Sequence, residues 1–165
     1  MKGTRLFFAS AVILGIIEAL YFYPLIPDCM AVHFNASGRA DGWGSKDHLF
    51  LTMGIVFALL VALFGGLPML IRRLPVSLIN LPNKDYWLAP ERKQKTMDRF
   101  IDQLLFVGAM ALLLLDGVSY FTFKANLSSK PALPVAWLWG LIAAFLIINV
   151  VWTISLIRSF RRPRA

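Results

Sequence analysis

Four apolar runs, each long enough to cross a bilayer, limit what this chain can fold into. They cover residues 6–23, 49–71, 104–123 and 135–157, and about 20 apolar residues cross the hydrocarbon core as a helix. Hydrophobic residues make up 58% of the 165 residues and charged ones only 16%, which leaves too little polar surface for a soluble domain. The sequence therefore predicts an all-α membrane protein, with a single four-helix transmembrane domain over residues 1–165 that forms an antiparallel bundle.

The basic residues are segregated between the loops. Of the 17 Lys and Arg, two precede the first run, seven lie in the loop 72–103 and four follow the fourth run. Because loops rich in Lys and Arg stay in the cytoplasm, we expect both termini on the cytoplasmic side of the membrane and the loop 27–48 outside. This distribution accounts for the net charge of +8 without a nucleic-acid partner.

The outer loop 27–48 concentrates the polar chemistry of the chain and contains both histidines. Residues 31–35 are predicted to be extended, which places His33 and Asn35 on the same side. Glycines at 38, 42 and 44 permit the tight turns that return Asp41 and Lys46 toward them. The candidate motif for ligand binding or for structure is therefore His33, Asn35, Gly38, Asp41 and Lys46.

Three explanations of this motif stay open. In a structural one, His33 and Asn35 hydrogen-bond the loop onto the helix ends while Asp41 pairs with Lys46 or Arg39. In the second, the loop forms a small-molecule or peptide site. In the third, it contributes to a metal site, although the single cysteine excludes a thiol cluster and no familiar metal-binding spacing is present.

Two acids, Glu18 and Asp116, lie within the apolar runs, where ionisable side chains are costly and mark functional sites. Counting from the outer ends of the first and third runs, both carboxylates are expected about 6 to 8 Å below the outer interface, just under the loop 27–48. Two neighbouring carboxylates are relieved by a shared proton, by Lys or His, or by a cation. We therefore consider His33, Glu18 and Asp116 as ligands of a divalent cation such as zinc; no other cofactor is indicated.

Two further patterns concern helix packing. Small residues recur at every fourth position of the second run, at Gly54, Ala58, Ala62 and Gly66, and they suit close approach of another helix in this chain or in a second copy. Pro90 suits the first turn of a helix. If that helix continues unbroken to residue 123, its first turns stand clear of the bilayer, with basic side chains near anionic headgroups.

The outer loop also resembles a known motif. Pro27, the run Val32-His33-Phe34-Asn35, Gly38, Asp41 and Lys46 are similar to the motif of a bacterial membrane-protein family of unknown function. The domain of that family also forms the first part of the immunity protein against the sporulation-delaying toxin, and residues 81–87 resemble a cytoplasmic-loop segment of its four-span members. The resemblance implies the membrane fold, importance of the motif residues, and a role in toxin immunity and signal reception. It implies no catalytic residue.

These observations support one leading hypothesis and two alternatives. The leading hypothesis is a non-enzymatic binding, sensing or immunity-type membrane protein with an outward-facing polar site and a peptide or protein partner. One alternative is a small membrane metalloenzyme that uses Glu18, His33 and Asp116. The other is a protein that handles cations or protons through the two buried acids.

Overall fold

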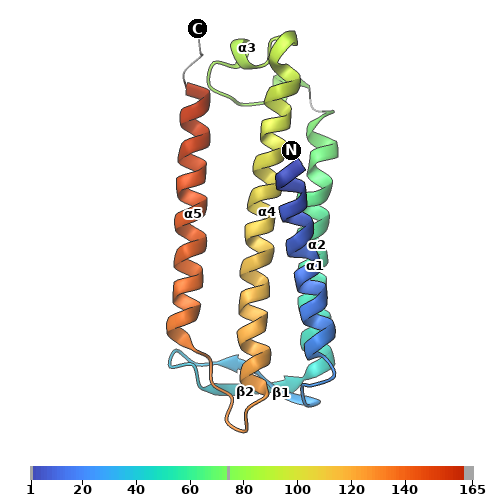
Figure 1. Ribbon diagram of the computed structural model, residues 1–165, viewed down its shortest axis with the longest axis vertical. Helices are drawn as coiled ribbons and strands as arrows, with labels where there is room; N and C mark the ends of the chain where they lie inside the picture. Colours follow the sequence, from blue (N-terminus) through green and yellow to red (C-terminus); the bar gives the residue numbers. More distant parts are fainter. Residues whose placement is uncertain (1, 74, 162–165) are drawn as a thin grey trace.

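The computed structural model describes residues 2–73 and 75–161, and four helices in this part of the chain are long and apolar enough to cross a bilayer. These are α1 (Lys2–Phe22), α2 (Lys46–Ile71), α4 (Pro90–Asn126) and α5 (Val135–Arg161), which run along the long axis of the molecule (Figure 1). Their outward faces expose large apolar side chains such as Leu20, Leu59 and Ile147, as lipid-facing surfaces do. The expectation of a multi-pass helical membrane protein agrees with this architecture. The basic residues after Arg161 lie outside the described residues.

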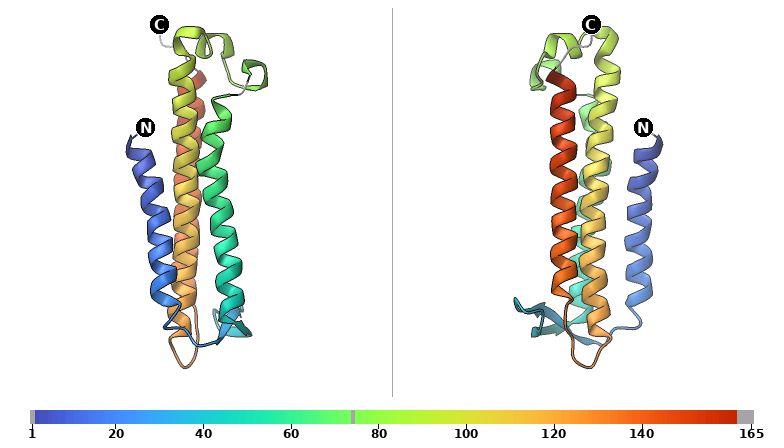
Figure 2. Two further views of the ribbon diagram at one scale, coloured as in Figure 1. Left: turned by 90° about the vertical axis from the view of Figure 1, so that its right-hand side faces the viewer. Right: turned by 60° about the vertical axis from the view of Figure 1, so that its left-hand side comes forward.

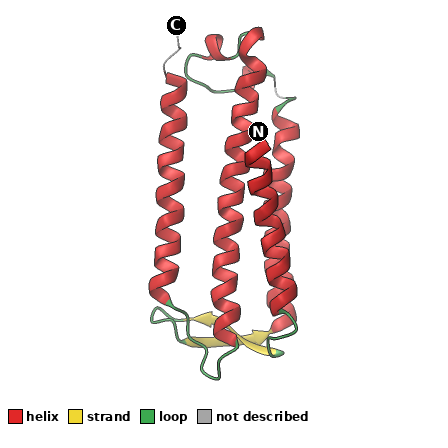
Figure 3. Ribbon diagram, viewed as in Figure 1, coloured by secondary structure: helices red, strands yellow, loops and turns green. Residues whose placement is uncertain are grey.

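The expectation of an all-α chain needs one correction, because the loop 27–48 contains a two-stranded antiparallel hairpin (Figure 3). Strand β1 (Cys29–Phe34) pairs with β2 (Ala40–Ser45), and the register is irregular on both sides of His33. Residues 31–34, predicted to be extended, belong to β1. The strands form because their apolar inner face is covered: Met30 and Ala31 are fully buried.

Helix α4 is the centre of the bundle, and Figure 2 shows α1, α2 and α5 arranged around it. The most extensive helix packing is between α1 and α4, followed by α2 with α4. Ala11 of α1 packs with Ala109 and Leu112 of α4 in a buried cluster. A Cβ added at Gly108 of α4 would meet the side chains of Phe64 and Phe8, so the three helices approach closely there.

No other described helix approaches α2 as closely at the two glycines of its small-residue pattern. Apart from the adjoining residues and backbone of α2 itself, no described atom lies within 4 Å of a Cβ built at Gly54 or Gly66. Homo-oligomerisation through Gly54, Ala58, Ala62 and Gly66 stays a prediction, and Gly54 borders a cavity between α1, α2 and α4 of this chain.

The hairpin closes one end of the bundle, below α1, α2 and α4 in Figure 1. Met30 packs with Phe22, Ile26 and Phe123 in a buried cluster, and Phe50 stacks on Phe123 with ring centroids 4.6 Å apart. The buried side chain of Asn126, in the last turn of α4, accepts a hydrogen bond from the Ala31 N–H at 2.6 Å and donates one to the Ala31 carbonyl at 3.0 Å. The hairpin is thus fixed to the end of α4 by apolar packing and by two buried hydrogen bonds.

At the opposite end, two short helices connect α2 to α4: η1 (Val76–Leu78) and α3 (Lys84–Trp87). Leu81, Leu88 and Met97 pack there around Phe160 of α5, and the indole N–H of Trp87 donates to the Phe160 carbonyl at 2.8 Å. Helix α4 begins at Pro90, as predicted, and its 37 residues make it about 56 Å long. Because of this length, the first turns of α4 extend beyond the apolar segments of the neighbouring helices.

Candidate functional site

Glu18 of α1 and Asp116 of α4 line the same cavity, which has a volume of about 250 Å³ and lies between α1, α2 and α4. The sequence places both acids at the same depth in the membrane, which predicts this proximity. Most of the remaining described wall is apolar and includes Phe50, Phe57 and Phe123. The cavity therefore combines two acids with a hydrophobic enclosure, as small-molecule sites commonly combine a few polar groups with apolar walls.

Both acids have a buried oxygen without a hydrogen-bond partner among the described residues, namely Glu18 Oε1 and Asp116 Oδ2. The side chain of Asp116 is 5% exposed. It reaches this position because α1 has a glycine opposite it: a Cβ at Gly15 would lie 2.6 Å from Asp116 Oδ1 and 2.5 Å from the Phe57 ring. Since buried polar groups in folded proteins are normally hydrogen-bonded, the two oxygens are available to a proton or a ligand.

His33 lies on the exposed part of the hairpin and pairs with Asp41 instead of entering this cavity. Its Nδ1 is 2.5 Å from Asp41 Oδ1, and the two side chains are 72% and 42% exposed. The expectation that Asp41 pairs with Lys46 or Arg39 is wrong. The antiparallel pairing sets His33 opposite Gly42, so the neighbouring Asp41 is the nearest acid.

Asn35 and Gly38 build the turn between the strands. The side-chain oxygen of Asn35 accepts hydrogen bonds from the Ser37 N–H, the Ser37 hydroxyl and the Arg39 N–H at 3.0, 2.7 and 3.0 Å. Gly38 has a φ of 81°, which favours glycine. Its carbonyl accepts from the N–H of Leu133 in the α4–α5 connection at 2.8 Å. Both residues therefore have a structural role, and the turn docks onto the α4–α5 connection instead of a helix end.

Lys46 secures the start of α2 to the chain that precedes β1. Its Nζ lies 3.0 Å from Asp28 Oδ1, donates to the Ile26 carbonyl at 3.3 Å and lies 4.9 Å from the Tyr23 ring centroid. The Tyr23 hydroxyl donates to Asp47 at 2.8 Å, and this hydrogen bond to a carboxylate raises the pKa of Tyr23. The contacts of Tyr23 with Asp47 and of Lys46 with Asp28 thus connect the end of α1 to the start of α2.

The residues predicted as metal ligands are only partly brought together. Glu18 and Asp116 share the cavity, whereas His33 is engaged by Asp41 at the exposed surface. Among residues 2–73 and 75–161, no group of three His, Cys, Asp or Glu side chains is placed to hold a metal ion. A zinc site formed by His33, Glu18 and Asp116 stays a prediction, and two carboxylates alone supply fewer ligands than protein zinc sites use.

Sequence reasoning did not identify Asn126, although it is the buried connection between α4 and the hairpin. The available signal was its position, since an amide directly after a long apolar run lies where a helix end needs polar partners. Its partner is 95 residues away in the chain, which local patterns do not reveal.

The four spans, the docked hairpin and the acidic cavity define a multi-pass helical membrane protein with a polar cap on one end of the bundle. Residues 11–57 match the family model of a domain of unknown function, DUF1648. No curated protein and no solved structure matches the chain. The matched segment contains Glu18, the whole hairpin and the first half of α2, whereas Asp116 lies outside it.

Proposed function

We propose that this protein is a non-enzymatic binding or sensing protein of the bacterial cytoplasmic membrane. Both termini lie in the cytoplasm, the four spans form an antiparallel bundle, and the hairpin faces the exterior. The segregation of basic residues away from the hairpin end supports this orientation. The proposed ligand site is the Glu18–Asp116 cavity beneath the hairpin.

The observation that carries the proposal is a pair of buried carboxylate oxygens in one largely apolar cavity, neither of which has a hydrogen-bond partner among the described residues. Two buried carboxylates repel each other and lose hydration, which is relieved by uptake of a proton or by a positively charged partner. A bare divalent ion needs more ligands than two carboxylates supply. An ammonium group on an apolar body matches both the acids and the aromatic wall, so the proposed ligand is an organic cation.

A peptide is one source of such an ammonium group, through its N-terminus or a lysine. The immunity-type role implied by the resemblance of the outer loop would be a case of this kind, with a peptide or protein partner entering beneath the hairpin. The match to a domain of unknown function over residues 11–57 supports treating the hairpin and Glu18 as one unit.

The test compares two probes that share an aromatic ring and differ in charge, benzylammonium and benzyl alcohol. Purified protein in neutral detergent is heated with each probe, because a ligand that binds only the folded state raises the unfolding temperature. We expect benzylammonium to stabilise the wild type more than benzyl alcohol. The preference should disappear in Glu18→Gln/Asp116→Asn but persist in Asp85→Asn/Glu91→Gln, which removes two acids that do not line the cavity.

Equal stabilisation by both probes, or an unchanged preference in the Glu18/Asp116 variant, would contradict an organic-cation site. The same acids also support the second candidate, cation or proton handling, because ionisable side chains within spanning helices commonly serve such pathways. Proteoliposomes containing wild type or the Glu18/Asp116 variant distinguish the two functions: acid-dependent flux of protons or cations favours handling, and its absence favours binding alone.

A further inference from the structure

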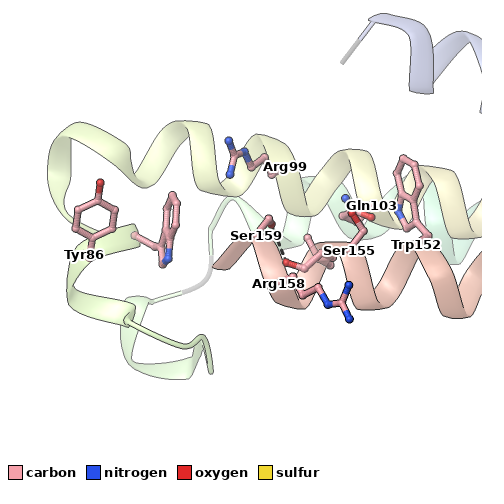
Figure 4. Close-up of a pocket in the computed structure, with 9 residues that line it drawn as sticks. Tyr86, Arg99, Gln103, Trp152, Ser155, Arg158 and Ser159 are labelled. Carbon is pink, nitrogen blue, oxygen red and sulfur yellow. Dashed lines mark hydrogen bonds between the residues drawn. The ribbon is translucent and has the colours of Figure 1, made fainter. Parts of the chain in front are cut away.

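A second pocket lies at the opposite end of the bundle, between α4, α5 and the α3 segment, and the Glu18–Asp116 site does not involve it. This α4–α5 pocket has a volume of about 610 Å³ and is lined by Arg99, Gln103, Trp152, Ser155, Arg158 and Ser159, together with Tyr86 and Trp87. Figure 4 shows Arg99 on α4 and Arg158 on α5 at opposite borders, with Gln103, Ser155 and Ser159 between them. The described lining is therefore basic and rich in hydrogen-bond donors, and it contains no acid.

Arg99, Arg158 and Gln103 are the lining residues whose polar groups are available for a ligand. Neither Arg99 nor Arg158 pairs with a carboxylate among the described residues. The side-chain oxygen of Gln103 is buried and has no hydrogen-bond partner there. Because the two ends of an amide can exchange places, Gln103 can turn its NH₂ group toward an anion in the pocket. Two guanidinium groups without a carboxylate partner among the described residues, with an amide nearby, are suited to phosphate oxygens, whereas the Ser159 hydroxyl donates to the Leu156 carbonyl at 2.7 Å.

The apolar side of the pocket extends toward the membrane interior. Trp152 stacks on Phe106 of α4 with ring centroids 3.9 Å apart, whereas Trp87 of α3, at the end of the bundle, lies 5.7 Å from the Arg99 guanidinium in a cation–π contact. A ligand in the pocket would therefore contact charged groups at one side and an aromatic surface at the other. This division matches a molecule with an anionic head and an apolar tail.

The depth of the pocket agrees with the headgroup region of a bilayer. Arg99 lies about 40 Å along α4 from Asn126, and Arg158 lies about 35 Å along α5 from Val135. The hydrocarbon core is about 30 Å thick, and the headgroup layers extend the bilayer to about 40 to 45 Å. The two guanidinium groups thus fall among headgroups, while Trp152, about 26 Å along α5 from Val135, falls at the edge of the core.

We propose that the α4–α5 pocket is a binding site for the phosphate-bearing headgroup of an anionic membrane lipid, held by Arg99 and Arg158, with the acyl chain beside Trp152. Basic pockets between spanning helices bind such headgroups on the cytoplasmic side of membranes. The lipid would fill the space between α4 and α5, a helix pair that packs less extensively than α4 does with α1 or α2. The proposal is independent of the Glu18–Asp116 site.

The test measures lipid retention by native mass spectrometry on the full chain in neutral detergent. The protein is titrated with phosphatidylglycerol, cardiolipin or phosphatidylcholine, and inorganic phosphate is added as a competitor in a parallel series. We expect phosphatidylglycerol or cardiolipin to bind the wild type at least tenfold more tightly than phosphatidylcholine. Arg99→Gln/Arg158→Gln should remove this preference, and Gln103→Leu should reduce it.

The matched control is Lys93→Gln/Lys95→Gln, which removes the same charge from the same end of α4 outside the pocket. If this control loses as much lipid preference as the arginine pair, general surface charge is the cause and the site is refuted. If inorganic phosphate at millimolar concentration displaces the lipid and stabilises the protein as well as the lipid does, the ligand is a free phosphate and the acyl contact is wrong. Equal binding of anionic and neutral lipids also overturns the proposal.

Discussion

Asn126→Ala should release the hairpin from the end of α4. In the wild type, the Asn126 amide satisfies both the N–H and the carbonyl of Ala31, and both Asn126 and Ala31 are buried. Truncation leaves both backbone groups without these partners, and an unsatisfied buried group costs about 1 to 3 kcal/mol. Because some water enters the space left by the amide, we expect a loss of about 2 to 4 kcal/mol in the free energy of hairpin opening.

Hydrogen exchange measures this change locally. A loss of about 2 to 4 kcal/mol corresponds to exchange that is about 30- to 900-fold faster. Deuterium uptake by peptides covering residues 27–48 should therefore rise in Asn126→Ala, while peptides from the centre of α4 should change little. The helices keep their apolar packing in this variant, so the protein remains folded enough for the comparison.

The matched control is Asn149→Ala on α5. The Asn149 amide donates to the Phe145 carbonyl of its own helix at 2.8 Å, and its described contacts include no hydrogen bond to the hairpin. This variant loses the same atoms without touching Ala31. Unchanged protection of the hairpin in Asn126→Ala, or an equal loss in both variants, would refute the reasoning that the Asn126 amide anchors the hairpin.

Three further predictions concern the hairpin end of the molecule. Gly38→Ala puts a side chain on a left-handed backbone, which costs about 1 to 2 kcal/mol of folding free energy. The new Cβ would also lie 2.5 Å from the Leu133 carbonyl oxygen. In an SDS titration, the unfolding midpoint of this variant should therefore be below that of wild type. The hydrogen bond from Tyr23 to Asp47 raises the pKa of Tyr23. This bond therefore stabilises the fold at neutral pH, and its contribution is lost as the pH rises through the raised pKa. In a spectrophotometric titration of tyrosinate, one tyrosine should ionise at lower pH in Asp47→Asn than in wild type. Cys29 is exposed at the start of β1, so a membrane-impermeant maleimide should label it in intact spheroplasts, and labelling only after lysis would place the hairpin in the cytoplasm.

Local patterns in the sequence predicted several elements because local interactions determine them. The four spans follow from the length of the apolar runs, since burial of backbone polar groups in lipid requires helices of that length. The start of α4 follows from Pro90, whose fixed φ and missing N–H suit a first helical turn. A turn at Gly38 follows from the backbone freedom of glycine, whereas Asn35, predicted in the extended stretch, belongs to the turn, and Gly42 and Gly44, predicted in turns, lie in β2.

The sequence alone determined that the chain is helical, long enough to cross a membrane four times, and polar at one loop. Only the tertiary structure decided that α4 is central, that Asp41 pairs with His33, that Asn126 holds Ala31, and that Glu18 and Asp116 face one cavity. Small residues allow close helix contact at many positions, and the structure uses Gly15 and Gly108 but leaves Gly54 and Gly66 open. Which faces meet depends on the combined packing of side chains from distant segments, and hydrophobic periodicity within one helix does not specify that choice.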